Sequence, residues 1–160
     1  MGYTTDFDGS FKINKPLDDG TFNLINGLAG TRRMGRRGLA FEYGEEGEFY
    51  YDPHSDDYGQ ENNSNIIDYN RPPKTQPGLW LQWFVLDDRQ TIEWDQGEKF
   101  YQYVEWIEYL IDKILEPRGY KVSGTVFWEG EDGESDIGKI EIKDNQVKVY
   151  VGKIHYVEEK

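Results

Sequence analysis

The residues whose types and spacing most clearly suggest a binding site are four arginines close together in the chain. They are Arg32, Arg33, Arg36 and Arg37. A guanidinium group is planar and permanently charged, and its fork of N–H donors fits a phosphate or a carboxylate. The cluster therefore predicts one of two arrangements: a site for an anionic ligand, or a set of ion pairs with acidic residues of the same chain.

A second candidate binding segment runs from Asp68 to Trp83 and contains three prolines. Prolines stiffen a loop, so ordering it around a ligand costs less entropy. Its tryptophans could stack on a flat ligand, although alternation along the strand places one of Trp80 and Trp83 in the core. An anion pocket built from both segments would use Arg32, Arg33, Arg36, Tyr69, Asn70, Arg71, Trp80 and Trp83.

Residues suited to catalysis are few. The chain has no cysteine and only two histidines, His54 and His155. His54 has acids on both sides, but without the spacing of a known metal motif. No phosphate-cradling glycine loop or nucleophile elbow is present. We therefore predict no catalytic residue, no bound metal and no cofactor, and an enzyme is the less favoured reading.

The chain is strongly acidic, with a formal net charge of -13. Such a charge repels a phosphate backbone and argues against general nucleic-acid binding. It also allows a second function, in which an acidic surface imitates nucleic acid and binds a basic protein as an inhibitor or adaptor. That surface would comprise nine acids between Glu42 and Asp68, and five in one turn: Glu129, Glu131, Asp132, Glu134 and Asp136.

Length and composition predict one folded domain over residues 1–160. The 160 residues are 36% hydrophobic and 16% aromatic, enough for a single core. We expect a mobile acidic insertion at about 44–65, where polar residues dominate. The apolar runs are too short to span a membrane, and the N-terminus lacks a signal pattern, so we predict a cytoplasmic protein without membrane contact.

Apolar periodicity predicts two helices. The longer one runs from Gln96 to Glu116, with Asp95 as its N-cap and Pro117 and Gly119 as its stop signals. A shorter helix follows Asp18 or Asp19 and ends before Gly30, which places the arginine cluster at or just after its C-terminal end.

Alternating or aromatic runs predict the strands. The first is Tyr3 to Ile13, and a small hairpin is possible over residues 41–51. A second hairpin joins residues 79–86 to 91–94, and further strands cover 120–128, 137–143, 147–151 and 154–157. This order predicts an α+β fold, a mainly antiparallel sheet with two helices on one face, and an elaborated ferredoxin-like split unit is one form it could take.

Three motifs resemble those of an uncharacterised family of small proteins from bacteria and their phages. They are Thr31-Arg32-Arg33-Met34, Asp68 to Pro73 continuing through Gln76-Pro77-Gly78-Leu79-Trp80, and Glu98 to Tyr101 with Trp106. The resemblance implies a recurring fold and a phage or bacterial setting, and it supplies no activity or catalytic residue. The sequence as a whole favours a non-catalytic protein that binds an anionic small molecule or nucleotide, with the acidic inhibitor or adaptor as the alternative.

Overall fold

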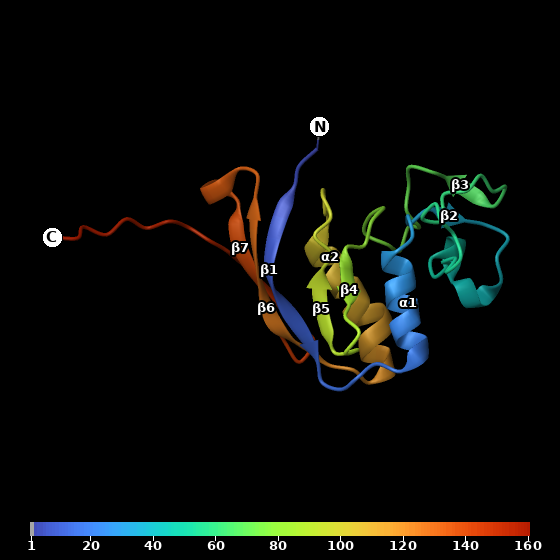
Figure 1. The fold of residues 1–160 in the computed structure, drawn as a ribbon, viewed down its shortest axis with the longest axis horizontal. Helices are drawn as coiled ribbons and strands as arrows, with labels where there is room; N and C mark the ends of the chain where they lie inside the picture. The colour runs from blue at the N-terminus through green and yellow to red at the C-terminus, as the bar shows by residue number, and fades with distance from the viewer. Residues whose placement is uncertain (1) are drawn as a thin grey trace.

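The computed structural model describes residues 2–160 and is built around one six-stranded sheet. The strands lie in the order β4-β5-β1-β6-β7-β8, and every neighbouring pair is antiparallel. Figure 1 shows the chain from N- to C-terminus. The strands are β1 (Thr5–Ile13), β4 (Trp83–Val85), β5 (Thr91–Trp94), β6 (Val122–Gly130), β7 (Ile137–Lys143) and β8 (Gln146–Val151).

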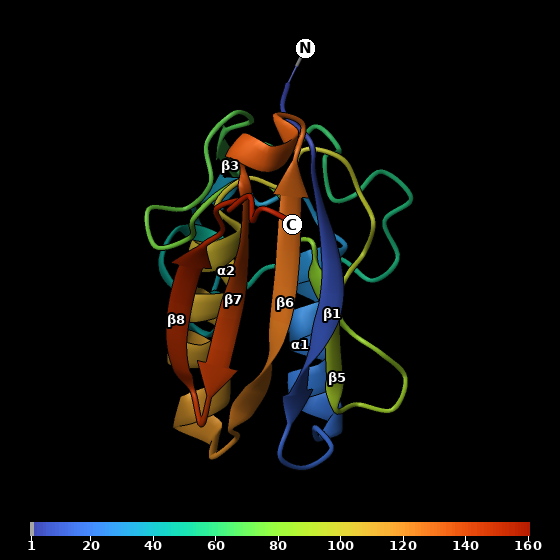
Figure 2. The same ribbon diagram turned by 90° about the vertical axis from the view of Figure 1, so that its left-hand side faces the viewer.

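Two helices, α1 (Asp19–Ala29) and α2 (Tyr103–Tyr109), pack on the same face of this sheet. Figure 2 views the molecule from the opposite face, with both helices behind the strands. α1 links β1 to β4, with β5 between them, and α2 links β5 to β6, with β1 between them. This is the connectivity of a split β-α-β unit extended by the β7-β8 hairpin. The predicted α+β class, a mainly antiparallel sheet with two helices on one face, is confirmed.

The core lies between the sheet and the helices and is rich in aromatic rings. β1 alternates as predicted: Phe11 and Ile13 are buried on the helix side, and Phe7 lies half-buried beside them. The Phe7 ring makes edge-on contacts with Trp83 and Phe100, with centroids 5.3 and 5.7 Å apart. Each such contact adds about 0.5–1.5 kcal/mol to the burial of the rings themselves.

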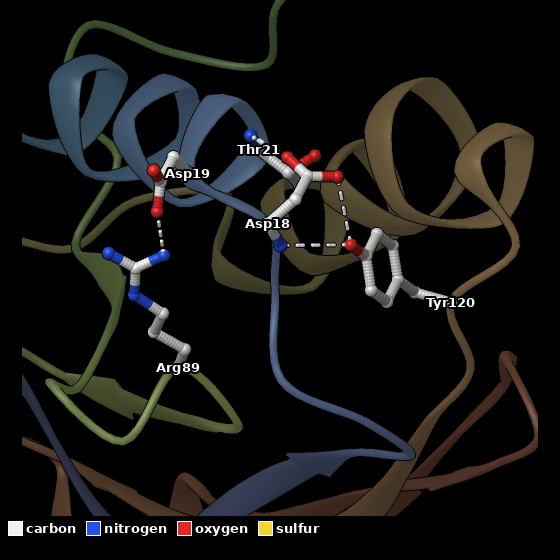
Figure 3. A network of polar contacts seen from close by, with 5 residues as sticks. All are labelled: Asp18, Asp19, Thr21, Arg89 and Tyr120. Carbon is white, nitrogen blue, oxygen red and sulfur yellow. Dashed lines mark hydrogen bonds and ion pairs between the residues drawn. The ribbon is translucent and has the colours of Figure 1, made fainter.

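Asp18 begins α1 and also fastens it to the start of β6 (Figure 3). Its carboxylate accepts a hydrogen bond from the backbone N–H of Thr21 at 2.7 Å and from the hydroxyl of Tyr120 at 3.0 Å. These hydrogen bonds lower the pKa of Asp18, and the one from the Thr21 N–H is the largest cause. The Tyr120 hydroxyl in turn accepts the Asp18 N–H, and Arg89 pairs with Asp19 beside it. The predicted N-cap is confirmed.

The long helix begins seven residues later than the sequence predicts. Regular helix starts at Tyr103, passes through a π-helical turn over Leu110–Leu115 and ends in a 3₁₀ turn over Glu116–Arg118. Residues 95–102 instead form an irregular loop, because three of them (Gln96, Lys99 and Gln102) have positive φ. The loop carries Phe100 into the core, where it is 1% exposed. The predicted capping role of Asp95 was wrong: its carboxylate accepts the N–H of Gly97 within the loop.

The predicted hairpin over residues 41–51 was also wrong. The structure has two 3₁₀ turns there, Phe41–Tyr43 and Glu45–Gly47. Within residues 2–160 the strands near this insertion are the short pair β2 (Gly35–Arg36) and β3 (Ile66–Asp68), which the sequence did not indicate. Residues 152–160 at the C-terminal end likewise contain no strand, in contrast to the predicted strand at 154–157.

Candidate ligand-binding site

Arg33 is buried and holds the acidic insertion to the body of the protein. Its side chain is 1% exposed, and each of its three nitrogens donates a hydrogen bond. Nη2 donates to the carbonyl oxygen of Glu48 at 2.7 Å, Nη1 to that of Tyr50 at 2.9 Å, and Nε to the side chain of Gln76 at 3.1 Å. Burial lowers the pKa of Arg33 to about 10, so it stays charged at neutral pH. This guanidinium organises the fold and is closed to a solvent ligand.

Arg36 has a similar structural role nearby. Its Nη2 donates to the carbonyl oxygen of Gly59 at 2.5 Å, and its guanidinium lies 4.3 Å from the centre of the Tyr50 ring. Burial lowers its pKa, and the residue is 3% exposed. The adjacent Arg37 is exposed. Among residues 2–160 no arginine of the cluster forms an ion pair, so the buried members pair with carbonyl oxygens of the insertion and not with its carboxylates.

Arg32 is the member of the cluster that reaches the surface beside the proline-rich segment. Its guanidinium lies 5.6 Å from the centre of the Trp80 ring. Nε donates to the carbonyl oxygen of Tyr69 at 3.0 Å, and Nη2 lies 3.5 Å from the side-chain oxygen of Asn70. The structure thus brings together four of the predicted site residues. Arg71 stays on the exposed side of this loop, where it pairs with Asp68 at 3.6 Å.

The two tryptophans of the segment have different environments. Trp83 lies in β4, is fully buried, and donates its Nε1 hydrogen to the carbonyl oxygen of Tyr103 at 2.9 Å. It is therefore the tryptophan that alternation assigns to the core, and it does not reach a ligand from solvent. Trp80 precedes β4, is half-buried, and meets the ring of Tyr58 edge-on at 5.9 Å.

A pocket of about 430 Å³ opens beside Trp80. It lies between the proline-rich segment and the irregular loop that precedes α2. This volume is within the usual range of small-molecule sites, and the exposed lining is mostly apolar, which is also usual. Two charged side chains, Lys99 and Glu98, also line the pocket. The lining residues are Pro72, Pro77, Gly78, Leu79, Trp80, Glu98, Lys99, Tyr101 and Gln102.

An unpaired donor lies behind the pocket wall. The Nε1–H of Trp106 is, among residues 2–160, the buried side-chain polar atom without a hydrogen-bond partner. A Cβ added to Gly78, which lines the pocket, would lie 3.5 Å from this nitrogen. Buried donors are nearly always satisfied, so this one marks a place where an acceptor is favoured.

Sequence reasoning did not find the second wall of this pocket. Lys99, Tyr101 and Gln102 were assigned to the long helix, where they would have pointed to different sides. The positive φ of Lys99 and Gln102 breaks that helix and lets the loop face Trp80. Lys99 and Gln102 are residue types that favour helices, so neither of them indicates the break, and the local signal against a helix is Gly97.

Comparison of the chain with models of protein families, with curated proteins and with solved structures finds no match. In the described part of the chain no three histidine or acidic side chains are grouped closely enough to hold a metal ion. None of the helices of residues 2–160 is long and apolar enough to cross a membrane.

Proposed function

We propose that this chain is a non-catalytic binding protein whose ligand is a small anion with a flat apolar part, such as a nucleotide. The ligand lies in the pocket beside Trp80. The observation that carries the proposal is an apolar, aromatic pocket lined by Lys99 and Glu98, with Arg32 5.6 Å from the ring of its Trp80, on a protein that is otherwise strongly acidic.

Each part of the ligand has a matching part of the site. A flat ring stacks on Trp80 or Tyr101, and such stacking on an aromatic side chain is worth about 1–3 kcal/mol. The anionic group pairs with Lys99 or with the donors of Arg32 that Tyr69 and Asn70 leave free. The prolines Pro72 and Pro77 stiffen the wall that carries Trp80, so the pocket is largely formed before the ligand arrives.

Isothermal titration with three related probes tests this proposal. AMP carries both a ring and an anion, adenosine only the ring, and ribose 5-phosphate only the anion. We expect AMP to bind more tightly than either half. Trp80→Ala should weaken AMP binding by about 5- to 150-fold, the equivalent of a lost stacking interaction.

Two arginine variants provide matched controls for the anion. Arg32→Met should weaken AMP but leave adenosine unchanged. Arg37→Met removes the same charge from an exposed arginine, whereas the guanidinium that lies against the Trp80 ring is that of Arg32, so Arg37→Met should leave all three probes unchanged. Equal binding of AMP by the wild type and by Trp80→Ala would contradict the proposal, as would equal effects of the two arginine variants.

A second candidate function is the acidic inhibitor or adaptor. It is favoured by the scarcity of cationic partners for the acids: in residues 42–68 and 129–136 of the described chain, only Glu46 and Asp68 form ion pairs. A basic protein captured through this surface would be released as salt rises. Pull-downs at low and at high salt, with the wild type and with a variant neutralised at Glu129, Glu131 and Glu134, test this alternative.

A further inference from the structure

The exposed edge of the sheet is formed by β8, and it is unusually apolar for a free edge. β8 pairs with β7 on one side. Val149 is 45% exposed and Val151 is 71% exposed. The edge strands of β-sheets are normally protected by charges, prolines or bulges, because a free edge offers unpaired N–H and C=O groups to another strand.

The chain after β8 carries a second set of exposed apolar residues. Figure 1 shows this C-terminal segment, residues 152–160, extending away from the body of the protein. Ile154, Tyr156 and Val157 are 45%, 83% and 79% exposed. The segment thus contains residues that favour a β-strand, but it lies beside no other strand.

The backbone of β8 is arranged to accept such a strand. The Gly152 N–H donates to the carbonyl oxygen of Ile137 at 2.8 Å. Hydrogen-bonded positions alternate along an antiparallel ladder. Even-numbered residues of β8 therefore bond to β7, and Val147, Val149 and Val151 turn their backbone groups to the open edge.

We propose that two copies of this chain dimerise through this edge, with residues 154–158 of each copy pairing antiparallel to β8 of the other. The two-fold axis passes at Lys153, so that a residue and its opposite partner have numbers that sum to 306. In this register Val149 faces Val157, Tyr150 faces Tyr156 and Lys148 faces Glu158.

The register extends the rows that already cross the sheet. Ile140 is buried opposite Val149, so Val157 of the second copy continues an apolar row of the core. Glu141 is opposite Lys148, so Glu158 of the second copy would give the lysine an acid on each side.

The neighbouring registers fit less well. With the axis at Ile154, Lys148 would face Lys160 and Tyr150 would face Glu158. With the axis at Gly152, Lys148 would face Tyr156 and would have no acid from the second copy beside it. The chosen register has one unfavourable feature, the meeting of the two Lys153 side chains. Lys153→Gln should therefore tighten the dimer.

Sedimentation velocity over a range of protein concentrations tests the dimer and its register. We expect the wild type to dimerise and Lys148→Glu or Glu158→Lys to raise the dimer dissociation constant about tenfold, since each dimer contains two such pairs. The double variant, Lys148→Glu with Glu158→Lys, should return to within about threefold of the wild type. Glu134→Lys, a charge reversal on an exposed acid outside the edge, is the control and should have no such effect.

A wild type that stays monomeric at all concentrations overturns the proposal. So does a dimer that both single variants leave intact. Failure of the double variant to recover, while each single variant weakens the dimer, overturns the register. None of these measurements involves the Trp80 pocket, so their outcome is independent of the proposed ligand.

Discussion

Replacing Arg33 by methionine should destabilise the protein far more than the same change at Arg32. Arg33 makes three charge-assisted hydrogen bonds at 2.7–3.1 Å, each worth about 1.5–3 kcal/mol. Burial of the charge opposes them: it lowers the pKa of Arg33 from its usual range to about 10, a shift that corresponds to about 3 kcal/mol. Methionine fills the space but leaves the Tyr50 carbonyl without its donor. The net loss should be about 3–5 kcal/mol.

Urea denaturation followed by tryptophan fluorescence measures this loss. Arg33→Met should lower the unfolding midpoint strongly, with the slope of the transition unchanged. Arg32→Met, whose side chain is only half-buried, should cost less than about 1 kcal/mol. If Arg33→Met lies within about 1 kcal/mol of the wild type, or is less harmful than Arg32→Met, the assignment of Arg33 to the fold is wrong.

Three further predictions concern stability. Tyr120→Phe removes a buried hydroxyl that bonds to Asp18, and thermal unfolding should show a loss of about 1 kcal/mol. The pKa of Asp18 is lowered in the folded state, so its ionised carboxylate stabilises the fold fully above the ordinary pKa of 3.8, and this stabilisation disappears as the pH falls through the folded-state pKa. The difference in melting temperature between the wild type and Asp18→Asn should therefore shrink as the pH falls. A difference that stays constant with pH would refute this prediction. Gly124→Ala places a Cβ 2.7 Å from the carbonyl oxygen of Ser10 at φ +140° and should cost more than about 2 kcal/mol, whereas Gly119→Ala, with open space around it, should cost less.

The sheet and the first helix could be predicted from the sequence because their signals are local. The strand at 137–143 has the predicted bounds, and Asp18 caps α1 as its position before an apolar stripe indicates. The start of α2 could not be predicted in this way. Residues 95–102 include the helix-favouring Gln96, Glu98 and Lys99, but burial of Phe100 against the Phe7 and Trp83 rings outweighs their helix propensity, which is worth less than 1 kcal/mol per residue.

The candidate site was only partly predictable for a similar reason. Arg32 and Arg33 are the same residue type and are adjacent in the sequence, yet Arg33 is buried and Arg32 is not. Their difference depends on carbonyl oxygens that lie 15 or more residues away, at Glu48 and Tyr50. Periodicity could say that one tryptophan faces the core, and only the three-dimensional structure identifies it as Trp83.

Native mass spectrometry of the protein purified from its own host, beside the same sample under denaturing conditions, tests the central claim most directly. The proposed pocket predicts an excess mass on the native wild type that is lost on denaturation and is absent from Trp80→Ala. The released compound should be an anion with a flat ring. An apo mass for the wild type, or the same bound compound retained by Trp80→Ala, would contradict the assignment of the pocket as the binding site.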